Sequence, residues 1–238
     1  MIGDSRFLEG KLAVVTGGTR GIGRAITQAM LDEGASVAIC GRSEESCRRA
    51  SAELVSSGGL CTGRVCDVSK PDDVHRFFEF IDEHLGGIDI LINNAGVGAF
   101  KAVADLSIEE WNQVIGTNLN GVFYCCREAI PRMRRRGGGS IINISSLAGK
   151  NPFAGGAAYN ASKFGLNGFS EAMMLDHRHE GIRVSYIMPG SVSTEFMSGE
   201  AEWKIGAAEI AEIVLSILHL PERTLVSRVE VRPSRPKQ

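Results

Sequence analysis

Long apolar runs are absent from this chain of 238 residues. No run approaches the roughly 18 apolar residues that a membrane-spanning helix needs, and residues 1–11 contain no apolar core of signal-peptide length. A large excess of charge is absent as well, because the formal net charge is only −2. Such a balance gives no overall attraction to nucleic acid or to an anionic membrane. We therefore expect a soluble, cytoplasmic protein with no nucleic-acid partner and no membrane partner.

Metal-ligand spacing is missing too. The six cysteines form no C-x-x-C pair, and the histidines are scattered along the chain. His177 and His179 are two residues apart, a separation that does not share a helix face. We expect reduced thiols that behave as small apolar side chains, and no bound metal.

A basic run, RMRRRGGG at 132–139, is the other feature that could suggest nucleic-acid binding. It lacks the interleaved aromatic residues of such sites. Arginines near the end of a helix face the negative end of its dipole, and glycines stop the helix. We interpret the run as a helix terminus.

What the chain does contain is a regular alternation of short apolar runs and longer amphipathic stretches. Strands are predicted at 12–17, 36–41, 60–68, 88–96, 140–145, 182–190 and 227–231, and helices at 24–35, 44–59, 71–85, 107–136, 158–180 and 208–219. Strands that are apolar on both faces and alternate with helices form a parallel sheet covered on both sides. The sequence predicts an α/β fold, one doubly wound domain over residues 1–238 with a parallel seven-stranded sheet and helices on both faces. Such folds bind ligands at the carboxyl ends of their strands.

The glycine turn TGGTRGIG, at 16–23, leaves the first strand and opens the first helix. Gly17, Gly21 and Gly23 leave room for a tight turn and a close ligand, and the helix N-terminus offers free N–H groups to a pyrophosphate. A plain strand-to-helix turn is the alternative. The position of the turn favours dinucleotide binding, although the spacing is G-x-x-x-G-x-G rather than G-x-G-x-x-G.

Further motifs follow in order along the chain. They are DV (67–68), NNAG (93–96), TNLNGVF (117–123), SS (145–146), YNASK (159–163) and PGSVST (189–194). With the glycine turn, this set resembles the short-chain dehydrogenase/reductase family over roughly residues 9–195, and a 3-oxoacyl reductase-like member in particular. The resemblance implies a Rossmann-type fold and a nicotinamide cofactor.

The end of the second strand indicates which cofactor is bound. An acidic residue there takes the ribose 2′-OH of NAD, whereas an arginine accommodates the 2′-phosphate of NADP. Here Gly41 stands at the acidic position, Arg42 follows it, and Arg20 lies inside the glycine turn. We predict NADP(H), with NAD(H) as the alternative if both arginines are ordinary surface residues.

The resemblance assigns the remaining cofactor contacts. It places Thr19 and Ile22 in the glycine turn, Asp67 and Val68 against the adenine, Asn94, Ala95 and Gly96 against the adenosine ribose, and Pro189, Gly190, Val192 and Thr194 at the nicotinamide end. Each set lies just past the end of a predicted strand.

Tyr159 and Lys163 are four residues apart and therefore share a helix face. A cation near a phenol favours the phenolate, so we expect Lys163 to lower the pKa of Tyr159. Tyr159 could then exchange a proton with a carbonyl or alcohol oxygen. By resemblance, Ser146 hydrogen-bonds the substrate oxygen, Lys163 also contacts the nicotinamide ribose, and Asn118 holds a water that connects Lys163 to solvent.

We expect an NADP-preferring enzyme that interconverts a small-molecule carbonyl and a secondary alcohol. A non-catalytic NADP-binding sensor or scaffold, and an isomerase or dehydratase on the same fold, are the alternatives. Relatives pair two long helices between subunits, so a homodimer or homotetramer is expected. Residues 195–209 would form at most a short lid, which includes Trp203. The residues expected to line the substrate site are Val97, Phe100, Leu147, Phe153, Phe196 and Met197.

Overall fold

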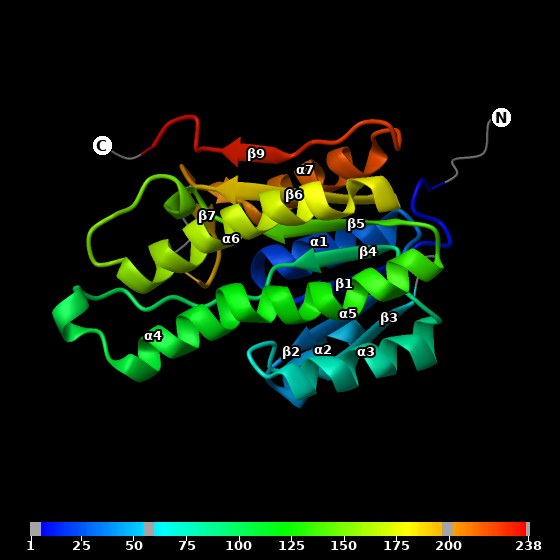
Figure 1. The fold of residues 1–238 in the computed structure, drawn as a ribbon, viewed down its shortest axis with the longest axis horizontal. Helices are drawn as coiled ribbons and strands as arrows, with labels where there is room; N and C mark the ends of the chain where they lie inside the picture. Colours follow the sequence, from blue (N-terminus) through cyan, green and yellow to red (C-terminus); the bar gives the residue numbers. More distant parts are fainter. Residues whose placement is uncertain (1–5, 55–59, 197–201, 237–238) are drawn as a thin grey trace.

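Seven parallel strands form the centre of the structure, a computed structural model that describes residues 6–54, 60–196 and 202–236 (Figure 1). Their order across the sheet is β3-β2-β1-β4-β5-β6-β9. The strands are β1 (Leu12–Thr16), β2 (Ser36–Gly41), β3 (Cys61–Val65), β4 (Ile90–Asn93), β5 (Gly139–Ile144), β6 (Ile182–Pro189) and β9 (Arg228–Val231). This confirms the predicted sheet. The order reverses between β1 and β4, so the carboxyl ends there flank a crevice.

Helices cover both faces of the sheet, with α5 and α6 in front of it and α1 and α7 behind it in Figure 1. The helices are α1 (Gly21–Asp32), α2 (Glu44–Glu53), α3 (Pro71–Leu85), α4 (Ile108–Ile115), α5 (Gly121–Arg135), α6 (Ala157–His177) and α7 (Ala207–His219). Consecutive residues of one strand enter different cores. Val14 packs in the cluster with α3, α5 and α6, whereas Ala13 and Val15 pack in the cluster with α1 and α7. That two-sided burial is why the strands read as continuous apolar runs.

The predicted helix at 107–136 has the expected ends but a different middle. Ser107 caps α4 through a reciprocal capping box with Glu110, and α5 stops before Gly137. Between α4 and α5, residues Gly116–Asn120 form a π-helical turn, which the regular apolar spacing did not predict. Such turns occur frequently at functional sites.

Other element boundaries also differ from the predictions. Helix α1 begins at Gly21 inside the glycine turn rather than at 24, and α2 ends at Glu53 rather than at 59. Residues 55–59 lie outside the described part of the chain. A second, two-stranded parallel sheet was not predicted; it pairs β7 (Val192–Ser193) with β8 (Ile205–Gly206).

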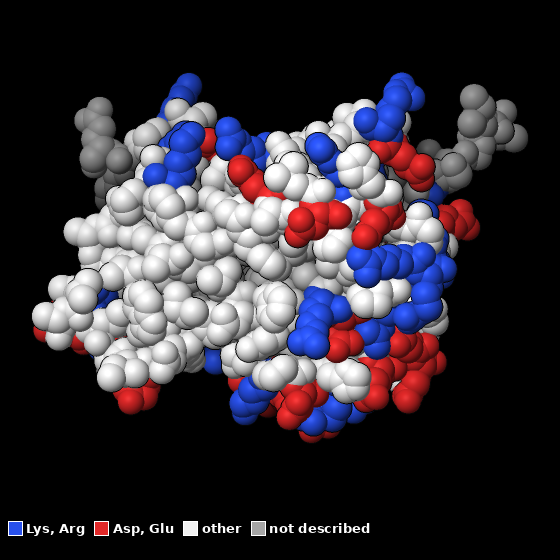
Figure 2. All heavy atoms as spheres, viewed as in Figure 1, with Lys and Arg blue, Asp and Glu red and all other residues white. Residues whose placement is uncertain are grey.

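The basic run at 132–139 is held in ion pairs. Arg132 lies 2.6 Å from Glu128 and 2.8 Å from Asp82, and Arg136 lies 2.8 Å from Asp89. Figure 2 shows positive and negative side chains interspersed at this end of the molecule. Among the described residues, no helix is both long and apolar enough to cross a membrane.

Candidate active site

A large cleft lies at the carboxyl ends of the strands. Its volume is about 1010 Å³, and its wall includes the glycine turn, the segments after β2 to β6, and the first turns of α6. This is the place where a doubly wound sheet binds ligands. All but two of the predicted site residues within the described ranges line it. The exceptions are Gly23 and Asn118.

The glycine turn is tied to the end of β4 by Asn94. The Asn94 side-chain amide donates to the carbonyls of Thr16 at 3.0 Å and Gly17 at 3.1 Å. The Thr16 hydroxyl accepts from the backbone N–H groups of Asn94 and Ala95. The N-terminus of α1 therefore has a fixed position beside the cleft, where its free N–H groups suit an anion.

The structure gives a packing reason for glycine at position 23, which differs from the ligand contact that we expected there. A Cβ atom at this position would collide with the Asn94 amide and the Gly17 carbonyl. The absence of a side chain therefore lets α1 pack against the turn. By contrast, Gly17 has a φ of +64°, a left-handed conformation that favours glycine.

Arginines gather where β2 ends. Arg20, Arg24, Arg42 and Arg49 all line the cleft. Arg24 pairs with Glu53 at 3.0 Å, and Arg20 pairs with Glu195 at 3.3 Å. In the part of the chain that the structure describes, Arg42 and Arg49 have no acidic partner, so their guanidinium groups can take an anion. Arg49 was missed in the sequence because it lies on α2, away from any motif.

The other residues expected to contact the cofactor lie in the turns after β3 and β6. Asp67 accepts from the backbone N–H and the hydroxyl of Ser69, which shapes the turn after β3, and Val68 is buried beside it. After β6, Thr194 lies close to Gly21, since a Cβ atom built there would be 3.5 Å from the Thr194 methyl group. The β7–β8 pair holds this segment over the start of α1.

The lid expected at 195–209 is described only in part. Phe196 and Trp203 line the cleft, as does Glu195. Met197 lies outside the described residues. Residues Ile205–Gly206 form β8, and α7 begins at Ala207.

Tyr159 and Lys163 project from the first turns of α6. The Ser146 hydroxyl, which follows β5, lies near enough to the Tyr159 hydroxyl to favour its phenolate. The Lys163 ammonium donates to the carbonyl of Ile144, the last residue of β5, at 2.8 Å. Its Nζ lies 5.7 Å from the centre of the Tyr159 ring. Three chemistry-bearing groups are thus brought together at the end of one strand.

The pKa shifts of Tyr159 and Lys163 differ from the predicted lowering of the Tyr159 pKa. Burial raises the pKa of Tyr159, and the nearby Ser146 hydroxyl only partly opposes this. The expected lowering of the Tyr159 pKa is therefore wrong for this structure. Burial also lowers the pKa of Lys163 to about 8. At neutral pH the phenol keeps its proton, while roughly nine-tenths of Lys163 is charged.

Asn118 lies in the π-helical turn, and only 1% of it is exposed. Its Oδ1 accepts from the Val97 N–H at 2.8 Å, while its Nδ2 donates to the Val97 carbonyl at 2.9 Å and to the Ser162 hydroxyl at 3.0 Å. Both amide hydrogens are therefore used within the protein. The side chain joins α6 to the segment after β4 rather than facing the cleft.

Ser145 and Asn167 form a connection that the sequence did not indicate. Ser145 donates to Asn167 Oδ1 at 2.5 Å, and Asn167 Nδ2 donates to the Gly149 carbonyl at 3.0 Å. Asn167 follows Lys163 by one helical turn. It therefore fixes the loop that carries Ser146 to the helix that carries Tyr159.

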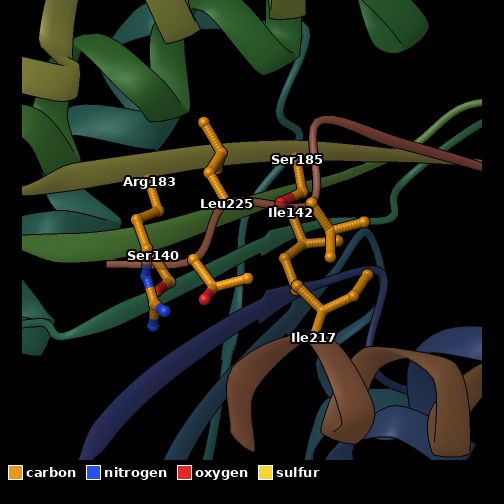
Figure 3. Close-up of a pocket in the computed structure, with 8 residues that line it drawn as sticks. Ser140, Ile142, Arg183, Ser185, Ile217 and Leu225 are labelled. Atoms are coloured by element: carbon orange, nitrogen blue, oxygen red, sulfur yellow. The ribbon is translucent and has the colours of Figure 1, made fainter. Parts of the chain in front are cut away.

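A second, much smaller cavity lies at the opposite end of β5 and β6 (Figure 3). Its volume is about 10 Å³, which is room for about one water molecule. Arg183 and Ser140 both line it, and Arg183 donates to the Ser140 hydroxyl and the Leu220 carbonyl, both at 3.1 Å. This cavity is too small for a substrate.

Burial disfavours the thiolate form of several cysteines, and no metal cluster is found in the residues described. All six cysteines are free. Burial raises the pKa of Cys61 to about 11 and that of Cys126 to about 12. Within 6–54, 60–196 and 202–236, no group of three or more His, Cys, Asp or Glu side chains could hold a metal ion.

The short chain dehydrogenase family matches residues 11–205. A 3beta-hydroxysteroid dehydrogenase of Mediterraneibacter gnavus is 42% identical over 208 residues, which cover 87% of this chain and 75% of that protein. A dehydrogenase/reductase SDR family member 4 of Oryctolagus cuniculus is 36% identical over 203 residues, 85% of this chain and 77% of that one.

Two solved structures extend the likeness to almost the whole chain. The alcohol dehydrogenase of the archaeon Thermococcus sibiricus, complexed with 5-hydroxy-NADP, has a TM-score of 0.89 at 29% identity, covering 96% of this chain and 99% of its own. A metagenomic short-chain oxidoreductase in complex with NADP has a TM-score of 0.85 at 37% identity, with the same coverage.

Proposed function

The chain belongs to the short-chain dehydrogenase family, and from that premise we propose that it is an NADP(H)-dependent oxidoreductase that reduces a ketone to a secondary alcohol. The observation that carries the proposal is the group formed by Tyr159, Ser146 and Lys163. Their contacts place an acid, a second hydroxyl and a charge at the end of β5, inside the cleft.

The residues of the cleft suit a dinucleotide with a 2′-phosphate. The N-terminus of α1 suits the pyrophosphate, and Arg42 and Arg49 suit the 2′-phosphate. When bound, the nicotinamide supplies a hydride to the carbonyl carbon. The two solved relatives whose descriptions name 5-hydroxy-NADP and NADP support this choice of cofactor.

Tyr159 supplies the proton that the reaction needs. The carbonyl π bond breaks as a hydride reaches carbon, and the oxygen takes the Tyr159 proton to become the alcohol hydroxyl. Burial keeps that phenol protonated at neutral pH, which suits reduction rather than oxidation. Ser146 donates a second hydrogen bond to the same oxygen, and the charge on Lys163 stabilises the phenolate that remains.

The test uses Tyr159→Phe, which keeps the ring and removes the acid. Wild-type protein should consume NADPH, followed by its absorbance, with at least some of a panel of ketones. The variant should lose turnover by about 1,000-fold, in the middle of the range that a positioned acid contributes, while its affinity for NADPH changes less than about twofold. Full turnover in the variant would remove Tyr159 from this role, and tight NADPH binding without consumption by any carbonyl would indicate a sensor.

A homodimer through α5 and α6 is the assembly we propose. Apolar side chains are exposed on these helices, Phe123 by 44%, Phe164 by 47% and Leu175 by 55%. Figure 2 shows a broad area without charged side chains over this face. Apolar areas of that kind mark contacts between proteins. Light scattering in solution would distinguish the dimer from a monomer or a tetramer.

A further inference from the structure

Three phenylalanines lie beside the Tyr159 ring or next to each other in the cleft and remain open to solvent. Phe100 and Phe153 are each 43% exposed and Phe196 is 41% exposed, whereas Phe77 in the core is 1% exposed. They come from the segments after β4, β5 and β7. We call these three residues, together with Tyr159, the aromatic cluster. Solvent-open aromatic rings grouped in a cleft mark a binding surface rather than a core.

The rings are in mutual contact. The Phe100 ring centre lies 5.6 Å from that of Tyr159, 5.9 Å from that of Phe153 and 6.4 Å from that of Phe196. The Tyr159 and Phe196 centres are 6.0 Å apart. These are ordinary separations for aromatic pairs. Phe100 and Phe196 therefore flank the Tyr159 ring, close to where a substrate would approach it.

Two glycines leave room for the rings of Phe100 and Phe153 to pack against the backbone. A Cβ atom at Gly98 would lie 2.5 Å from the Phe100 ring, and one at Gly156 would lie 2.6 Å from the Phe153 ring. The Phe153 carbonyl accepts from Asn160 Nδ2 at 3.0 Å, which fixes its backbone to α6. A bridge between Lys101 and Gly156 joins the two segments. The rings are thus held in place before a substrate arrives, which lowers the entropic cost of binding.

Charged side chains near the aromatic cluster have partners within the protein. Among the described residues, Glu195 and Arg232 line this end of the cleft; Glu195 pairs with Arg20, and Arg232 pairs with Glu230 at 3.2 Å. Lys163 is buried on the Ile144 carbonyl. Of the residues that the structure describes, the arginines that lack an acidic partner in the cleft, Arg42 and Arg49, lie at its other end, where β2 stops, so this end offers little to a substrate carboxylate or phosphate.

We propose that the substrate is a neutral ketone whose carbonyl is part of, or attached to, a rigid ring that packs against the aromatic cluster. The inference rests on the proposed carbonyl reduction and names its substrate class. A rigid ring offers a flat face to the phenylalanine rings and loses little conformational freedom on binding. An open acyl chain has no such face. Among the described residues at this end of the cleft, a phosphate-bearing acyl carrier would find no cation without a partner.

The experiment compares three methyl ketones with six-carbon substituents, which are phenyl, cyclohexyl and n-hexyl, in NADPH-consumption assays with the wild-type holoenzyme. S-acetoacetyl-N-acetylcysteamine serves as the open-chain thioester. The two ring ketones should show kcat/KM values about tenfold above those of the hexyl ketone and the thioester, because two ring contacts favour them.

Variants then locate the preference. Phe100→Leu and Phe153→Leu should each lower kcat/KM about fivefold for the ring ketones, mainly through KM, and less than twofold for the hexyl ketone. Phe80→Leu is the matched control, since Phe80 lies on α3 outside the cleft. It should change none of these values.

Three results would contradict the proposed substrate class. Equal kcat/KM for ring and chain ketones, or an equal loss for all ketones in the phenylalanine variants, would overturn the ring preference and leave the proposed reduction standing. If none of the compounds consumed NADPH, the proposed function itself would fail, and the substrate class with it.

Discussion

The charge on Lys163 destabilises the folded chain, and Lys163→Met should reveal by how much. The residue is 4% exposed, and burial lowers its pKa from 10.5 to about 8. Holding the proton at pH 7 therefore costs the folded state about 3 kcal/mol relative to the unfolded chain. Removing the amine also leaves the Ile144 carbonyl without its partner, a loss of about 1–3 kcal/mol. The net change at neutral pH should be small.

The pH dependence separates these two effects. A base with a lowered pKa in the folded state binds fewer protons there than in the unfolded state, between about pH 8 and 10.5. Stability of the wild type must rise with pH over that window. From about pH 7 to about pH 9.5, wild type should gain about 2 kcal/mol relative to Lys163→Met. Subtracting the two curves removes the groups that titrate in both proteins.

Urea unfolding at several pH values measures this difference. Lys11→Met is the control, because Lys11 is exposed and remote from the cleft. Its free energy of unfolding should stay within about 0.5 kcal/mol of wild type at every pH. If the difference between wild type and Lys163→Met is constant with pH, Lys163 is not held as a buried, partly charged base. The proposed stabilisation of the Tyr159 phenolate would then lose its basis.

Three further predictions concern the rest of the site. Arg42→Ala should weaken NADPH binding about tenfold and NADH binding less than twofold in titrations, whereas Arg48→Ala, outside the cleft, should change neither; equal losses for both cofactors would contradict a 2′-phosphate contact. Gly23→Ala should lower the free energy of unfolding by about 1–3 kcal/mol in urea, because its methyl group displaces the Asn94 amide; an unchanged midpoint would refute that packing. Asn167→Leu should lower kcat about tenfold with an unchanged Kd for NADPH, because Ser146, to which we assign a role in catalysis, would shift; a parallel loss of cofactor binding would indicate general damage instead.

The sheet was predictable because strands buried on both faces read as short apolar runs. The π-helical turn at Gly116–Asn120 was not, because the apolar spacing along the helix gives no sign of it and its polar contacts are with another segment. Asn118 bonds both backbone groups of Val97, a contact between segments 21 residues apart. The β7–β8 pair was missed for another reason. Strands of two residues are too short to show an alternation of apolar and polar side chains.

In the candidate site, the spacing of residues along the sequence correctly predicted which side chains are neighbours. It did not predict the direction of the Tyr159 pKa shift. A separation of four residues places Tyr159 and Lys163 on one face of α6, as the structure shows. The direction of the Tyr159 pKa depends on how deeply both groups are buried and on which atom the ammonium meets. That atom is the carbonyl of Ile144 on a neighbouring strand. A pattern within one helix does not contain this information.

The partner of Lys163 also explains how a buried charge is tolerated at this point of the fold. Parallel strands end with carbonyl groups at one edge of the sheet, and the ammonium is held by the last one of β5. A hydrogen-bonded amine in that position keeps most of its charge at neutral pH, whereas burial without a partner would lower its pKa further. The same strand continues directly into Ser146. The end of β5 therefore lies next to both the Ser146 hydroxyl and the Lys163 ammonium, the two groups that we propose act together with Tyr159.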